Sequence, residues 1–381
     1  MRALACVLAG LLALSTGPAR AQAPDDALAS LWSALCPGAA PGSDLEQRCL
    51  EIANGGPGSR DLSAAGNFLG EIPGQGRAAT RDGAPDKAEA RSELGGGWSV
   101  FASADSGRLK RRDGINEAPF DGDTWALSAG VDWAPHERWR LGLLASHARE
   151  ELDFLASDGS TRTRYGGALL MLGWMPVDAL SVDAYAGWLD GDYALRRAID
   201  YTLPDGTSVQ TLASADASAR RRLAGLGLSW SQPAAGWEWQ VSGGVDWQRT
   251  EIEAYSETGG AGLAISVPGR SITSHRGRLD LGLSRTVSAS WGVWQPLARV
   301  GWRHEFANPS RPLAVRFVGD ANGTPVVFET DDADADWGEA ALGAVFVFPG
   351  GQSAFIEWRQ RFGHGFLDER LLALGWRIEL P

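Results

Sequence analysis

The feature that most constrains the fold is a series of long segments, between residue 95 and the C-terminus, in which apolar and polar residues alternate. A period of two is typical of β-strands that have one face in apolar surroundings. The alternation predicts about twelve strands, most of them longer than the roughly 5–6 residues usual in globular proteins. Their predicted spans are 97–111, 122–134, 138–154, 162–175, 179–197, 215–231, 236–254, 272–287, 292–306, 335–349, 352–363 and 370–380.

The links between these strands alternate in length. Short turns are predicted at 134–137, 175–178, 232–236, 288–290 and 348–351, and long polar loops at 105–121, 190–214, 255–271 and 307–334. Barrels of the bacterial outer membrane have short periplasmic turns at one rim and long outer loops at the other. We therefore predict an all-β fold over residues 95–381, an antiparallel transmembrane β-barrel of about twelve strands. The 17 tryptophans of the chain suit the aromatic girdles of such a barrel.

The two faces of the predicted strands differ in character. Between residues 276 and 284, Leu279, Leu281 and Leu283 oppose charged and small residues. A charge on the lipid side near the middle of the bilayer costs roughly 2–4 kcal/mol, so we expect the charged faces to point into the lumen. These charged faces line either a hydrophilic conduit or a polar interior in which the charges pair with one another. The sequence leaves both interpretations open. The predicted lumen-facing charges are Arg276, Arg278, Asp280, Arg299, Arg303, Glu305, Glu357, Arg359 and Arg361.

The strands of a soluble β-sandwich would show the same alternation of apolar and polar residues. The N-terminal sequence argues against that fold class. Residues 1–23 contain a basic residue, Arg2, an apolar run from Leu4 to Leu14, and small residues at the end. The run is shorter than the roughly 20 apolar residues of a spanning helix. We predict a cleaved secretory signal peptide, which sends the chain to the cell outer membrane.

Between the signal and the barrel, the sequence predicts a small helical hairpin over residues 24–60. Leu28, Leu31 and Leu35 share one helical face, and Ser43 is a plausible N-cap of the second helix. Cys36 and Cys49 are exported to an oxidising compartment, where a disulfide is favoured over two free thiols. Residues 61–94, rich in Gly, Pro and Ala, are predicted to be a linker or a pore-plugging segment.

Motifs for catalysis are missing from the sequence, so we predict no catalytic residue, no cofactor and no bound metal. His304 and Glu305 could form an acid–base set at the outer rim, but an ordinary position on a strand is the favoured interpretation. The acidic run at 331–336 lacks the Gly and the distal Glu of a helix-loop-helix calcium site, which favours a solvated loop. A net charge of −12 argues against nucleic acid as a partner.

Several stretches of the barrel segment resemble the autotransporter translocator domain, the barrel at the C-terminus of self-secreting outer-membrane proteins. The likeness lies in residues 296–306, in 338–343 followed by 348–358, and in the closing 374–377. The resemblance implies a twelve-stranded barrel in contact with outer-membrane lipid, inserted by the barrel-assembly machinery. It also implies that the last strand guides assembly, with the residues Leu374, Trp376, Ile378 and Leu380.

Only about 70 residues lie between the predicted signal and the barrel. Our leading hypothesis is an autotransporter translocator with a very short or absent passenger. The alternative is a non-secreting outer-membrane pore or surface interaction protein, whose residues 24–94 stay in the periplasm. Under either hypothesis a periplasmic or surface protein is a candidate partner, and an enzyme is the least favoured class.

Overall fold

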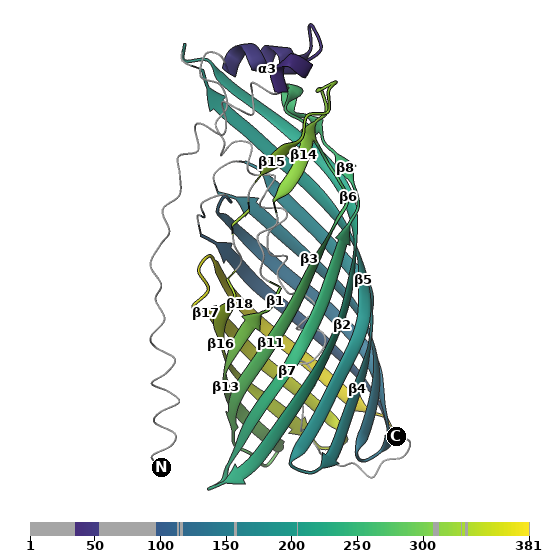
Figure 1. Ribbon diagram of the computed structural model, residues 1–381. Helices are drawn as coiled ribbons and strands as arrows, with labels where there is room; N and C mark the ends of the chain where they lie inside the picture. Colours follow the sequence, from purple (N-terminus) through teal and green to yellow (C-terminus); the bar gives the residue numbers. More distant parts are fainter. Residues whose placement is uncertain are drawn as a thin grey trace.

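The computed structural model describes residues 35–52 and 97–380, except 113, 115–116, 156–157, 204, 308–311, 329 and 332–333. The predicted signal peptide and the predicted linker at 61–94 lie outside the described residues, as does most of the first predicted helix. The described chain is a tall barrel with a small helical element at one end (Figure 1).

Twelve antiparallel strands close the barrel, which confirms the predicted fold class. Each strand pairs with its chain neighbours, and the ring closes where β1 runs antiparallel to β18, from the pair Ser99↔Glu379 to the pair Arg111↔Leu367. The strands are β1 Trp98–Arg111, β2 Phe120–His136, β3 Trp139–Phe154, β4 Ser160–Val177, β5 Leu180–Thr202, β6 Ser208–Ala234, β7 Trp237–Ile252, β11 Arg270–Ser284, β13 Gly292–Glu305, β16 Asp336–Phe348, β17 Gln352–Phe362 and β18 Leu367–Glu379.

The outer surface of the wall is apolar and bounded by tryptophan. Near the short turns, Trp98 stacks on Trp133, with ring centroids 5.9 Å apart. A second level of exposed tryptophans includes Trp125, which precedes Trp133 on β2 by roughly 26 Å of strand. Tryptophans at two levels with leucine and valine between them are typical of a barrel in a bilayer.

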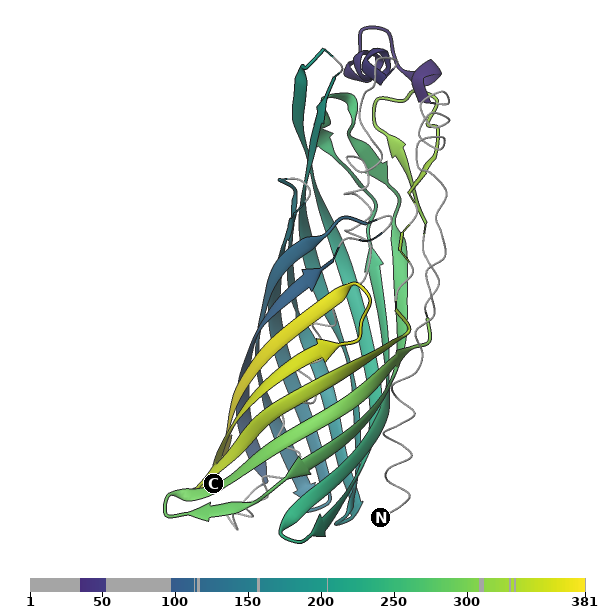
Figure 2. The same ribbon diagram turned by 90° about the vertical axis from the view of Figure 1, so that its left-hand side faces the viewer.

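Two strands extend well beyond the others at the end of the barrel opposite the C-terminus (Figures 1 and 2). The sequence predicted a long loop over 190–214, and this prediction is wrong: β5 and β6 continue through it as a hairpin, from Leu180↔Trp230 to Thr202↔Ser208. Outside the membrane the outward positions become polar, so the apolar alternation weakens although the strand pairing continues. Ile199 and Ala213 on the inner face of the hairpin are fully buried.

The other long loops build a small sheet at the same end, which we call the outer-loop sheet. It contains β8 Tyr255–Ser256, β10 Ile265–Val267, β14 Leu313–Phe317 and β15 Val326–Phe328, in the order β15-β14-β10-β8. Beside it lie β9 Thr258–Gly259, which pairs with β6, and the 3-10 helix η4 Gly260–Gly262. A further short strand, β12 Val287–Ala289, extends the β11–β13 connection.

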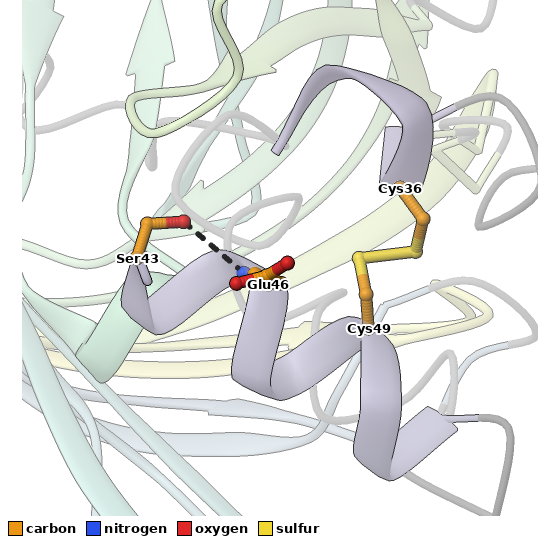
Figure 3. The surroundings of a disulfide bond; sticks show 4 residues. All are labelled: Cys36, Ser43, Glu46 and Cys49. Carbon is orange, nitrogen blue, oxygen red and sulfur yellow. Dashed lines mark hydrogen bonds between the residues drawn. A yellow bond between two sulfur atoms is a disulfide. The ribbon is translucent and has the colours of Figure 1, made fainter. Parts of the chain in front are cut away.

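The N-terminal element consists of the 3-10 helix η2 Cys36–Gly38 and the helix α3 Asp44–Ile52. The backbone N–H of Glu46 donates to Ser43 Oγ at 3.2 Å, and Gly42 donates to the carboxylate of Glu46, so the predicted N-cap is present (Figure 3). Cys36 and Cys49 form the predicted disulfide, with Cα atoms 5.6 Å apart. Within the described ranges, no helix has the length and the apolar character needed to cross a membrane.

Candidate functional site

The inner face of β11, β13 and β16 carries a buried ionic network centred on Arg303. Its guanidinium lies 2.8 Å from Asp280 on β11 and 2.9 Å from Glu339 on β16, and all three side chains are buried. Charges removed from water in this way are stable only when they are well paired. Arg303 therefore holds three adjacent strands together.

A second network continues along the same side of the barrel. Glu357 on β17 accepts from Arg299 at 3.1 Å and from Arg359 at 2.8 Å. Nearby, Arg361 pairs with Glu369 on β18 at 2.7 Å. The remaining predicted lumenal charges also have partners: Arg276 lies 3.6 Å from Glu305, and Arg278 lies 3.9 Å from Asp246.

The opposite wall, formed by β3 to β6, has a different character that the sequence analysis did not predict. Its inward residues Leu144, Leu169 and Leu223 are buried and form part of the largest apolar cluster. Among them lies Arg221, fully buried, with its guanidinium 4.3 Å from the ring centroid of Tyr165 and donating to the Tyr165 hydroxyl. The run Arg220-Arg221-Arg222 could have predicted this inward arginine, because side chains alternate between the two faces of a strand and the middle residue faces opposite to its neighbours.

The last strand presents its apolar residues outward. Leu374, Trp376 and Ile378 on β18 and Leu380 just beyond it are exposed on the outer surface of the wall. Between them, Arg377 points inward and lies 2.7 Å from Asp132 on β2, across the closing seam. This geometry suits a closing strand in contact with lipid. The role of β18 in barrel assembly stays a prediction.

The helical element docks on the outer-loop sheet. Leu35 and Leu45 are buried in one cluster with Phe317 of β14. Helix α3 contacts η4 so closely that a Cβ on Gly262 would lie 2.5 Å from the backbone nitrogen of Leu45. A contact this tight fixes the helix against the loop.

Asp320, in the turn after β14, organises the second contact. Its carboxylate accepts hydrogen bonds from the backbone N–H groups of Asn322, at 2.9 Å, and Thr324, at 2.5 Å. Burial raises the pKa of Asp320, but these hydrogen bonds outweigh burial and the net pKa lies below its usual value. Gly38 packs directly on this carboxylate, where no side chain would fit, and Ala39 forms a β-bridge with Asp320.

The rim candidates do not form a catalytic or metal site among the described residues. His304 Nδ1 lies 2.9 Å from Asp336 on the outer face, whereas Glu305, the next residue, is buried on the inner face. The acidic run is not simply solvated, because Asp331 is buried against Arg111 and Asp334 lies 3.1 Å from His364. Within the described part of the chain, no group of three or more His, Cys, Asp or Glu side chains could hold a metal ion.

Comparison with known proteins identifies the barrel. The family described as autotransporter beta-domain matches residues 100–359, more than half of the chain. The chain belongs to the autotransporter β-domain family. An autotransporter translocator domain is a transport barrel of the outer membrane, not a catalyst, and it works in a lipid environment.

Solved autotransporter barrels share the fold. The translocator domain of NalP from Neisseria meningitidis is similar with a TM-score of 0.59 and 14% identity, over 74% of this chain and 89% of that one. The β-domain of the Bordetella autotransporter BrkA is similar with a TM-score of 0.52 and 17% identity, over 74% of this chain and 100% of that one. No curated protein matches the sequence.

Proposed function

We propose that this translocator carries a short segment of its own chain, residues 24–94, to the cell surface. The observation that carries the proposal is the position of residues 35–52, which contact the outer-loop sheet at the end of the barrel away from the C-terminus (Figure 2). In outer-membrane barrels the long loops face outward and the short turns face the periplasm. The docked element therefore lies on the cell-surface side.

The connectivity of the chain supports export through the barrel. The described chain resumes at β1 beside the short-turn rim, where Trp98 stacks on Trp133, whereas α3 lies at the other end. The two described segments thus lie at opposite ends of the barrel. In a bilayer the lumen is the route that keeps a polar backbone out of hydrocarbon. On the side of β13 to β17 the lumenal wall carries ion pairs such as Arg299–Glu357, which makes that side of the route polar.

The contacts of the helical element favour retention at the surface over release. An element of this size cannot bury a sufficient core by itself, so it depends on the disulfide and on the surface that receives Leu35 and Leu45. The exported segment is thus short and stays docked. The chain would reach the periplasm through the signal peptide at 1–23, and the barrel-assembly machinery would insert the barrel by its last strand.

The experiment is a surface-accessibility assay in intact cells, with a periplasmic marker to verify a sealed outer membrane. One variant carries an epitope tag directly after Ala23, and a matched control carries the same tag at Gly350, in the β16–β17 turn at the periplasmic rim. We expect external protease to remove the first tag and spare the second. Protection of the tag after Ala23 until the cells are permeabilised would contradict export and favour the non-secreting pore with a periplasmic N-terminal segment.

A further inference from the structure

The docked helical element is held at two places, on two different loops. On the η2 side, the backbone N–H of Ala321 donates to the carbonyl oxygen of Gly38 at 3.1 Å. On the α3 side, Leu45 is buried and its backbone packs against Gly262 of η4. Ala321 belongs to the connection between β13 and β16, whereas Gly262 belongs to the connection between β7 and β11. Each half of the element thus has a docking contact of its own.

The disulfide joins these two halves. Cys36 begins η2, and Cys49 lies in the second half of α3 (Figure 3). Apart from the disulfide, only residues 39–43 connect η2 to α3. Helix α3 has 9 residues, and isolated helices shorter than about 12–15 residues are marginal in water. The helix therefore depends on its docking contact and on the disulfide that ties it to η2.

The disulfide contributes much of the stability of the docked element. Cys36 and Cys49 are 13 positions apart. In the chain-entropy model, a cross-link that closes a loop of this size favours the folded form by a factor of about 100. Loss of the disulfide should therefore lower the docking equilibrium of the element about 100-fold.

The barrel does not depend on the docked element. Its ring closes through the pairing of β1 with β18, and Arg303 joins three strands through its ion pairs with Asp280 and Glu339. These contacts contain no residue of η2 or α3. Opening of the disulfide should therefore change the docked element and leave the barrel folded.

The disulfide is open to attack by a small molecule. Cys36 and Cys49 are half-buried, and their chain neighbours Pro37 and Leu50 are exposed, Leu50 by 66%. The rate of thiol–disulfide exchange depends on access of a thiolate to the sulfur. The third cysteine of the chain, Cys6, lies in the predicted signal peptide, so the mature chain has no other thiol to exchange with.

We propose that the Cys36–Cys49 disulfide is a redox switch, which releases the docked element from the outer-loop sheet when an extracellular low-molecular-weight thiol reduces it. Release uncovers the apolar surface that receives Leu35 and Leu45. Such control rests on the proposed function, because only an element at the cell surface meets an extracellular thiol.

The reduction is an exchange in two steps. A thiolate attacks the sulfur of one cysteine, and the other cysteine leaves as a thiolate and takes up a proton. A second small thiol then attacks the small-molecule sulfur of the mixed disulfide, and the first cysteine leaves in the same way. Two small thiols thus supply two electrons and two protons and become one small disulfide, while Cys36 and Cys49 become free thiols.

The switch is tested by hydrogen exchange on the full mature chain, refolded in detergent with its disulfide formed. An excess of reduced glutathione should speed exchange at the amides of α3 about 100-fold and leave the amides of the barrel strands unchanged. In the control variant Cys36→Ser/Cys49→Ser, α3 should exchange at the rate of the reduced protein with or without glutathione. Equal protection of α3 in the oxidised and reduced proteins would overturn the proposal, as would an equal effect of glutathione on the control variant.

A second measurement separates the switch from the proposed function. Intact cells are treated with reduced glutathione and then with a polyethylene-glycol maleimide too large to cross the outer membrane. We expect labelling of Cys36 and Cys49 after reduction and none before it. If reduction releases α3 in the refolded protein but the cysteines are labelled only in permeabilised cells, the element is periplasmic and the proposed function is wrong. If the cysteines are labelled in intact cells but α3 stays protected in the reduced protein, export stands and the switch is wrong.

Discussion

Replacing Gly262 with alanine should release helix α3 from the outer-loop sheet while the barrel stays folded. Gly262 has a φ of +90°, and its added Cβ would lie 2.5 Å from the backbone carbonyl carbon of Asp44 and from the nitrogen of Leu45. Backbone atoms cannot yield to this overlap unless the helix moves. Gly206 is the matched control, because it has a φ of +86° in the β5–β6 turn and no atom within 4 Å of its added Cβ.

The expected effect is the difference in the free energy of α3 docking between the Gly262→Ala and Gly206→Ala proteins. Both place a side chain in the left-handed region, at a cost of roughly 1–2 kcal/mol, and this cost is common to both. Overlap with α3 adds about 1–3 kcal/mol for Gly262→Ala, the usual range for overpacking a close contact. Since 1.4 kcal/mol is a factor of ten, the docking equilibrium of α3 should fall by about 5- to 150-fold relative to the Gly206→Ala control.

Hydrogen exchange at the amides of α3 measures this equilibrium, because exchange reports the free energy of local opening. Gly262→Ala should speed exchange at Cys49, in the last turns of the helix, and leave the amides of the barrel strands unchanged. The Gly206→Ala protein should exchange at Cys49 as the unmodified protein does. Equal protection of α3 in both variants would refute the packing of the helix against η4.

Two further substitutions test the interior and the docking contact. Arg303→Gln leaves Asp280 and Glu339 buried without their cation, so we expect a loss of about 3–5 kcal/mol in the free energy of unfolding, measured by urea titration, with the exposed Arg370→Gln as control. Hydrogen bonds within its own turn lower the pKa of Asp320, so its contribution to the stability of the turn that receives Gly38 and Ala39 is present above the usual carboxyl pKa of about 3.9 and is lost as the pH falls through the lowered value. Exchange at α3 should rise on such acidification, and Asp320→Asn should abolish that dependence.

The sequence alone determined the class of the fold. Alternation with a period of two cannot be satisfied by a helix, and short turns alternating with long loops fit one closed sheet in a bilayer. The cysteines at 36 and 49 were sufficient to predict the disulfide, because exported thiols close in sequence have few other partners. The predicted spans of the strands near the short turns agree with the structure because the apolar pattern there is set by lipid.

Only the tertiary structure decided which residues meet. The pairing of Arg303 with Asp280 and Glu339, and the direct opposition of Arg149 and Arg164, depend on the register of neighbouring strands, which a single sequence does not contain. The β5–β6 hairpin was missed because its outward face meets water, where the apolar alternation ends although the hydrogen bonding continues. The docking of Leu45 beside Gly262 joins segments far apart in the chain, so no local pattern predicted which end of the barrel receives the helix.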